Sequence, residues 1–256
     1  MLNVDFRRMF TMPLFYIMLG ISVAVPILIL VMTTMMDGSV LVDPQTGEET
    51  VMEAFDNAWQ IIGIVSGGDA SDSTSAMSMD MMSMCNINLL YFAVAVLVCV
   101  FTAEDFRSGY AKNLFTVRAK KTDYVISKTL VCFTGGALMI LGFFSGTMLG
   151  SAISGLPFEM TGFNIGNLVM CLLSKMLLIS VFVSIYLLMS VIAKLKLWLY
   201  MLLSLMVGMF LFTMIPMLTP LNASIMNVLL CLAGGILLGT GLGAVSNQVL
   251  KRTSLV

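Results

Sequence analysis

The chain has 256 residues, of which 59% are hydrophobic and 11% are charged, and its mean hydropathy is +1.01. A water-soluble core of this length cannot bury so much apolar surface, so the composition excludes a soluble globular protein and predicts one solvated by lipid. The formal net charge of −1 decides little, because charges in a membrane protein act through the side on which they lie.

Six apolar runs are long enough to cross a bilayer core of about 30 Å, which takes about 20 helical residues. In chain order they lie at residues 12–36, 86–103, 127–154, 168–193, 197–219 and 225–248. Pro216 and Pro220 mark a kink or a broken outer turn in the fifth run. The sequence therefore predicts an all-α membrane protein, in which residues 1–256 form a single transmembrane domain of six helices.

The cations indicate how this bundle is oriented. If the N-terminus is cytoplasmic, the inner segments carry twelve of the thirteen Lys and Arg residues, whereas residues 37–85 carry nine acids and no cation. Lys and Arg near membrane spans are retained in the cytoplasm. We therefore expect both termini to be cytoplasmic and residues 37–85 to form a large extracellular segment between the first two spans.

Two features of this outer segment predict local structure. Apolar residues recur at helical spacing from Val51 to Ile62, which predicts an amphipathic helix over the mouth of the bundle. The last part of the outer segment is rich in sulfur-bearing side chains. These side chains could hold a soft ion such as Cu(I), or they could form an adaptable apolar lip. The sulfur-bearing residues are Met77, Met79, Met81, Met82, Met84 and Cys85. Because Met is frequent throughout the chain, we favour the lip.

The loop at residues 104–126, between the second and third spans, is the most cationic part of the chain. Together with Lys128 it holds six of the thirteen Lys and Arg residues. Phe106, Tyr110 and Leu114 recur at i, i+4 and i+8, which predicts a helix with an apolar edge suited to a groove on a partner. The alternative is a basic loop that only fixes the topology.

Charged residues of this loop fit the same interpretation. Arg107, Lys112 and Arg118 could pair with acids on the partner. Glu104 and Asp105 would lie at the N-terminus of the predicted helix, where negative charge is favoured. The loop is therefore a candidate docking element.

Small residues and one isolated cation stand out within the spans. Lys175 lies inside the fourth span, where it either snorkels to the outer headgroups or faces a cavity or an acid such as Glu159. Glycines at four-residue spacing expose backbone on one face of two spans, where we expect another helix to pack. They are Gly142, Gly146 and Gly150 in the third span and Gly235, Gly239 and Gly243 in the sixth.

Several residue types and motifs are missing from the sequence. It has no histidine, which argues against haem and His-based catalysis or proton relays, and no Gly-x-x-x-x-Gly-Lys-Ser/Thr loop for ATP phosphates. No acid lies deep within a predicted span, which disfavours an ion-coupled carrier. We expect a protein that is not an enzyme, holds no cofactor, binds no nucleic acid and receives energy from another subunit.

The run EDFRSGYAKNL at residues 104–114, then Arg118, then YVISK at 124–128, resembles the first cytoplasmic loop of ABC-2 type transporter permeases. It is most similar to the bacterial subgroup that exports bacteriocins, lantibiotics and similar amphipathic peptides or gives immunity to them. The resemblance implies a cytoplasmic coupling helix that docks on an ATPase subunit. The interface residues it implies are Glu104, Asp105, Phe106, Arg107, Gly109, Tyr110, Lys112, Asn113, Leu114, Arg118 and Lys128.

The resemblance also implies partners and a location. Two nucleotide-binding subunits would bind ATP and Mg²⁺, and a second permease copy, identical or homologous, would complete a complex in the bacterial cytoplasmic membrane. The cargo would be a hydrophobic or amphipathic peptide. Two alternatives remain, a copper-handling membrane protein that uses the Met77–Cys85 cluster and a non-transporting immunity or scaffold protein.

Overall fold

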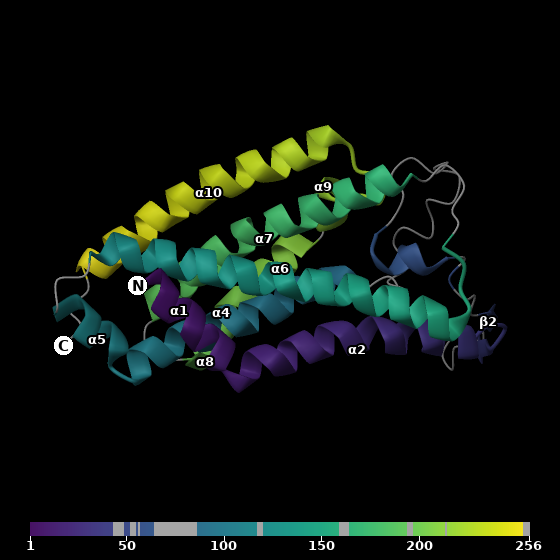
Figure 1. The fold of residues 1–256 in the computed structure, drawn as a ribbon, viewed down its shortest axis with the longest axis horizontal. Coiled ribbons are helices and arrows are strands. Elements are labelled where there is room, and N and C mark those ends of the chain that lie inside the picture. The colour runs from purple at the N-terminus through teal and green to yellow at the C-terminus, as the bar shows by residue number, and fades with distance from the viewer. Residues whose placement is uncertain are drawn as a thin grey trace.

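The computed structural model describes residues 1–42, 49–51, 55, 57–63, 86–116, 120–158, 164–193, 197–212 and 214–252. In these residues the chain forms an elongated bundle whose long helices run along a common axis (Figure 1). The elements are α1 (Leu2–Thr11), α2 (Pro13–Met35), β1 (Val40–Val42), β2 (Glu49–Val51), η1 (Ala58–Ile61), η3 (Ile87–Leu89), α4 (Leu90–Arg107), α5 (Tyr110–Thr116), α6 (Lys121–Ser154), α7 (Ile165–Ala193), α8 (Leu197–Phe212), α9 (Ile215–Leu218) and α10 (Ile225–Arg252).

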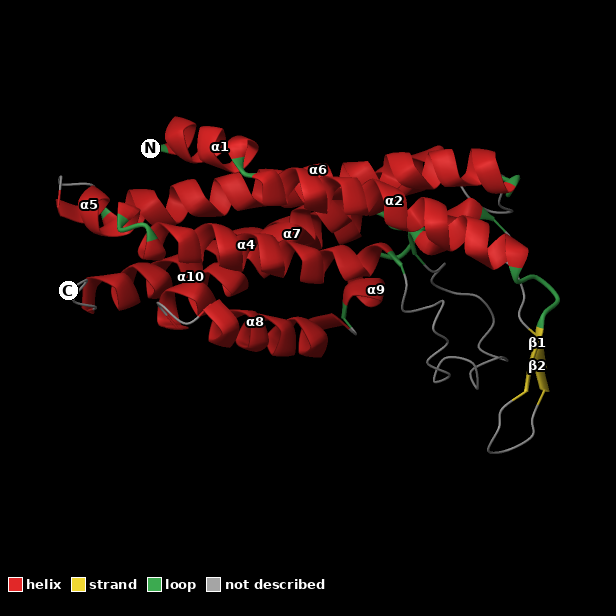
Figure 2. Cartoon of the chain, turned by 90° about the horizontal axis from the view of Figure 1, so that it is seen from below, coloured by secondary structure: helices red, strands yellow, loops and turns green. Residues whose placement is uncertain are grey.

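The two ends of the bundle carry different elements. One end, called the terminal end below, carries α1, α5 and the last turns of α10 (Figure 1). The opposite end, called the hairpin end, carries the short antiparallel strands β1 and β2, which project beyond the helices (Figure 2). The α1 and α5 segments, about 100 residues apart in sequence, are thus at the same end of the molecule.

Five described helical stretches are long and apolar enough to cross a membrane. They are Pro13–Met35, Ile87–Arg107, Lys121–Ser154, Ile165–Ile192 and Ile225–Lys251. The prediction of a membrane-embedded helical bundle is confirmed by these helices. Residues 197–219 differ from expectation, because α8 has 16 residues and is followed by α9, a four-residue helix with Pro216 in its first turn. The six-span topology stays a prediction.

Helix α1 is separated from the first span by a single residue. Met12 has the extended angles φ −77° and ψ 120°, and Pro13 begins α2. A residue before proline is driven out of the helical region by the proline ring, so the chain breaks here and restarts. The break lets α1 run in a different direction from α2 and pack against α6 (Figure 1).

Glycines of α6 bring that helix into close contact with α2. A Cβ atom at Gly146 would meet the backbone carbonyl of Val23 and the ring of Pro26, and one at Gly142 would lie 2.7 Å from Ser22 Oγ. Gly150 approaches the same helix, since a Cβ there would lie 3.0 Å from Ile27 Cα. The stripe predicted in the third span therefore faces α2 with no room for side chains.

The glycines of α10 pack more loosely. Gly235 approaches Ser180 of α7, but a Cβ at Gly239 would have its nearest neighbour at 3.6 Å and one at Gly243 at 3.8 Å, both ordinary contact distances. A groove of about 430 Å³ between α6 and α10 passes Gly239 and Gly243. Only the first glycine of this stripe makes a close helix contact.

The outer segment differs from the predicted amphipathic helix. Val51 ends a strand paired with Val40, and the described part of the region that follows contains only the 3-10 helix η1. Trp59 of η1 stacks on Phe144 of α6 with ring centroids 5.6 Å apart, and its indole N–H donates to the Phe158 carbonyl. The segment is thus anchored to the end of α6. The Met77–Cys85 cluster lies outside the described residues.

Candidate functional site: α5 and a buried ion cluster

The helix expected at residues 106–114 is interrupted. Helix α4 continues to Arg107, Gly109 takes the left-handed angle φ +73°, and α5 starts at Tyr110. Only glycine adopts this angle without a steric penalty, so the Ser108–Gly109 pair ends one helix and redirects the chain into the next. Phe106 therefore does not share a helix edge with Tyr110 and Leu114, which corrects the prediction.

The predicted helix N-terminus is also wrong. Glu104 and Asp105 lie in the last turn of α4, close to its C-terminus, where the helix dipole does not favour an acid. Glu104 faces solvent, whereas Asp105 is fully buried. Asp105 is retained there because cationic side chains surround it, as described below.

The predicted interface residues differ in how far they are exposed. Glu104, Arg107, Lys112 and Asn113 are exposed. Phe106, Gly109, Tyr110 and Leu114 are half-buried, and Asp105 and Lys128 are fully buried. Arg118 lies outside the described residues. The exposed group and the exposed parts of the half-buried group can touch a partner directly, whereas Asp105 and Lys128 belong to the interior of the terminal end.

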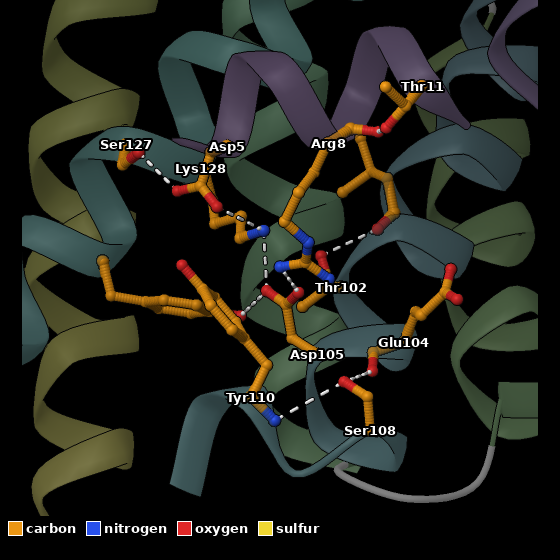
Figure 3. A network of polar contacts seen from close by, with 12 residues as sticks. Asp5, Arg8, Thr11, Thr102, Glu104, Asp105, Ser108, Tyr110, Ser127 and Lys128 are labelled. Carbon is orange, nitrogen blue, oxygen red and sulfur yellow. Dashed lines mark hydrogen bonds and ion pairs between the residues drawn. The ribbon is translucent and has the colours of Figure 1, made fainter. Parts of the chain in front are cut away.

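Lys128 of α6 is enclosed by two carboxylates from different helices. Its Nζ lies 2.7 Å from Asp105 Oδ2 of α4 and 3.1 Å from Asp5 Oδ1 of α1, and all three side chains are fully buried (Figure 3). These contacts are ion pairs without hydrogen-bond alignment. The ammonium also lies 3.7 Å from the centre of the Phe101 ring, which favours a cation over its face.

Three further side chains complete this ion cluster. Arg8 Nη1 donates to Asp105 Oδ1 over 2.6 Å, and the Tyr124 hydroxyl donates to Asp105 Oδ2 over 2.9 Å. The Ser127 hydroxyl donates to Asp5 Oδ2 over 2.6 Å. We define the ion cluster as Asp5, Arg8, Asp105, Tyr124, Ser127 and Lys128; it joins α1, α4 and α6.

The ion cluster holds equal numbers of opposite charges, two carboxylates against Arg8 and Lys128. Burying such groups is costly, and it is tolerated only where each has charged and hydrogen-bonding partners. Partial burial lowers the pKa of Arg8, whereas the Asp105 carboxylate raises it. The net shift of this pKa is upward, so the guanidinium remains charged. Because the charges balance, removing any one of them leaves a buried charge without its partner.

Two aromatic side chains of α5 contact this cluster. The Tyr110 ring lies under the Arg8 guanidinium at 4.2 Å, and the Phe115 ring meets the Tyr124 ring edge-on at 5.5 Å. Burial, and next the Asp5 carboxylate, raise the pKa of Tyr110, which keeps its hydroxyl neutral. Arg8 and Tyr124 both hydrogen-bond to Asp105. The two ends of α5 therefore contact side chains that share one carboxylate.

Sequence reasoning did not identify the α1 half of the cluster. Asp5 and Arg8 are three residues apart, and with Met9 they form the inner face of α1, while Leu2 and Val4 are 40% and 50% exposed. Arg7 on the same helix is exposed, so the sequence of α1 does not mark which of its charges turn inward. The partners of Asp5 and Arg8 lie on α4 and α6, and only the packing of these helices brings them together.

Lys175 does not snorkel. It is fully buried in α7, and its Nζ donates to Asn88 Oδ1 over 3.2 Å and to Thr219 Oγ1 over 2.9 Å. The alternative partner, Glu159, lies outside the described residues. Lys175 thus ties α7 to η3, which precedes α4, and to Thr219, the residue that follows α9.

The buried charges at the terminal end hold helices together, and the exposed charges leave α5 a candidate docking surface. Within the described ranges, no group of three or more His, Cys, Asp or Glu side chains could hold a metal ion. The cluster charges are engaged with each other inside the bundle, and the exposed charges on α4 and α5 face outward. Comparison with protein-family models, with curated proteins and with solved structures found no match to this chain.

Proposed function

We propose that this chain is the membrane subunit of an ATP-driven exporter of the ABC-2 type, and that a separate ATPase docks on α5. The proposal rests on the resemblance of residues 104–128 to the coupling loop of those permeases. The observation that carries it is the form of α5, a short helix that has exposed Lys112 and Asn113 on one side and is joined to α4 through Gly109. Such a helix can be displaced by a partner without unwinding a span.

The ion cluster supplies a route from α5 into the bundle. A push on the exposed face of α5 moves Tyr110 against Arg8 and Phe115 against Tyr124. Both contacted residues bond to Asp105, and Lys128 joins Asp105 to α1. Displacement of α5 therefore acts on α1, α4 and α6 as one unit. Concerted movement of these helices would open the path for cargo.

The remaining parts of the proposal follow the resemblance. Two ATPase subunits bind ATP and Mg²⁺, and a second permease copy completes the complex. Both termini lie in the cytoplasm of a bacterium, and the cargo is a hydrophobic or amphipathic peptide, exported or removed for self-immunity. This chain performs no covalent chemistry, and its contribution is to bind the ATPase and to change shape.

Co-purification tests the docking surface. A tagged chain is purified from its native host, and the ABC-type ATPase recovered per permease is measured by mass spectrometry. The double variant Arg107→Glu/Lys112→Glu reverses two exposed charges next to the Gly109 break without touching the cluster. We expect recovery to fall about tenfold or more, because the substitutions would place like charges against acids of the partner, and like charges facing each other at an interface are strongly unfavourable.

The control variant is Lys251→Glu, which reverses an exposed charge on the last turn of α10 at the same end of the bundle. It should leave recovery unchanged if α5 is the docking element, since it reverses a charge on α10 and leaves α5 itself unaltered. Full ATPase recovery with the double variant, or equal losses with both variants, would reject α5 as the docking element.

A further inference from the structure

Lys175 is a buried cation that the proposed coupling route does not use. Its ammonium is fully enclosed, and its two acceptors, the Asn88 side-chain oxygen and the Thr219 hydroxyl, are both neutral. An ammonium has three N–H donors, and the described residues offer no third acceptor. Within the described part of the chain, one N–H of Lys175 therefore has no acceptor.

Among the described residues, the charge of Lys175 is also without a counter-charge. In the ion cluster Lys128 faces two carboxylates, but none of the described carboxylates pairs with Lys175. A cation inside a membrane span is costly, and such residues commonly pair with an anion or mark a binding site. The local electrostatics thus favour an added negative charge at Nζ.

An apolar groove lies beside this cation. It has a volume of about 340 Å³ and is formed by α7, α10 and the α8–α9 region. Leu178 and Phe182 line it from α7, Leu218 from α9, and Cys231 and Gly234 from α10. Ligand pockets in proteins have volumes of about 300–1,000 Å³, so the groove accommodates a small apolar ligand.

The groove and the cation share one wall. Lys175 does not line the groove, but its acceptor Thr219 directly follows the lining residue Leu218, and Leu178 lies one helical turn beyond Lys175 on α7. This wall is α9, a four-residue helix, and its movement would open the groove to Nζ. A ligand in the groove would then meet the ammonium at one end.

We propose that the groove and Lys175 form a binding site for an amphiphile with one carboxylate, whose apolar chain fills the groove. The carboxylate accepts the free N–H of Lys175 and balances its charge. A single lysine is a point charge, whereas phosphate is typically held by several donors or by the fork of an arginine, so the site is assigned to a carboxylate. The assignment goes beyond the proposed function and does not depend on an ATPase partner.

Ligand binding to the purified chain in detergent tests the site, with laurate as the probe and native mass spectrometry as the readout. We expect one laurate per chain, and methyl laurate, which lacks the charge, to bind about tenfold or more weakly, because a charge-assisted hydrogen bond is lost. Lys175→Met should weaken laurate binding to the same degree, and Lys175→Arg should retain it.

Two glycines of α10 provide a matched pair that leaves Lys175 intact. A Cβ at either Gly234 or Gly241 would have no atom within 4 Å, but only Gly234 lines the groove. Gly234→Phe should therefore abolish laurate binding by filling the groove, and Gly241→Phe should leave it unchanged. This pair tests the site even if Lys175→Met fails to fold.

Four results would overturn the assignment. If the wild-type chain retains no laurate, the site does not exist. If methyl laurate binds as tightly as laurate, the charge plays no part in binding. Dodecyl phosphate bound more tightly than laurate would assign the site to phosphate instead. Undiminished laurate binding by Gly234→Phe would place the ligand elsewhere on the apolar surface.

Discussion

Two fully buried lysines in this chain are stabilised in different ways. Lys128 lies between Asp5 and Asp105, so its charge is compensated inside the protein, whereas the partners of Lys175 among the described residues are the neutral oxygens of Asn88 and Thr219. A compensated charge is a structural element that fixes helices in place. The neutral partners of Lys175 are the condition on which the proposed carboxylate site depends. The two lysines therefore differ in how their charges are compensated, despite equal burial.

The balance of charges in the ion cluster predicts a specific non-additivity. Lys128→Met leaves the Asp5 carboxylate buried beside Asp105, and losing one partner of a buried pair typically costs about 3–5 kcal/mol. Adding Asp5→Asn removes the uncompensated charge and leaves Arg8 paired with Asp105. We therefore expect the double variant to unfold at a higher temperature than Lys128→Met alone, measured in one detergent.

Asp123 provides the control for this comparison. It lies on α6 near Lys128 but is exposed, so Asp123→Asn should not restore stability to Lys128→Met. If Asp5→Asn and Lys128→Met lower the unfolding temperature additively, their charges do not compensate each other in the folded chain.

At the scale of elements, hydrophobic run length predicted six spans, and five described helices are long and apolar enough to cross a membrane, because each run must satisfy its own backbone in lipid. The boundaries of α6 were less predictable. It has 34 residues, about 51 Å of helix, so it extends well beyond a bilayer core of about 30 Å. Its polar first turns, from Lys121, appear in the sequence as a loop, since hydropathy does not distinguish a projecting helix from a connection.

The site was predictable only in part for a similar reason. Residue spacing placed Phe106, Tyr110 and Leu114 on one helix, but the left-handed Gly109 between them ends α4. Spacing alone carries no information on which face of a loop turns inward. The pairing of Asp5 with Lys128 joins residues 123 positions apart, which only the packing of α1 against α6 brings together.

The close contact between α2 and α6 depends on the lack of a side chain at Gly146. A Cβ at Gly146 would overlap the Val23 carbonyl, a backbone atom that cannot rotate away. We expect Gly146→Ala to cost about 1–3 kcal/mol or more, because the two helices must separate along their length. The measurement is the thermal unfolding temperature of the purified variant.

Gly241→Ala is the matched control, since it places the same methyl group in open space on α10. It should leave stability unchanged or raise it slightly, because alanine is a better helix former than glycine by about 0.5–1 kcal/mol. An equal effect of the two substitutions would mean that helix propensity, rather than the contact with α2, decides the outcome.

At the scale of the whole molecule, the bundle separates two chemical surfaces. The terminal end carries α1, α5 and exposed Arg107, Lys112 and Lys251, whereas the strands of the hairpin end come from the acidic, cation-free segment. Because Lys and Arg are retained in the cytoplasm, this polarity predicts that the terminal end faces inward. Docking of a cytosolic ATPase on α5 requires the same orientation.

Cysteine labelling in intact cells tests this orientation. With the five native cysteines replaced by alanine, Val40→Cys on the exposed hairpin should react with a membrane-impermeant maleimide from outside. Lys112→Cys and Lys251→Cys, both exposed at the terminal end, should react only after the membrane is opened. Labelling of Lys112→Cys in intact cells would place α5 outside, where no ATP-driven partner could reach it, and would therefore reject the proposed function together with the topology.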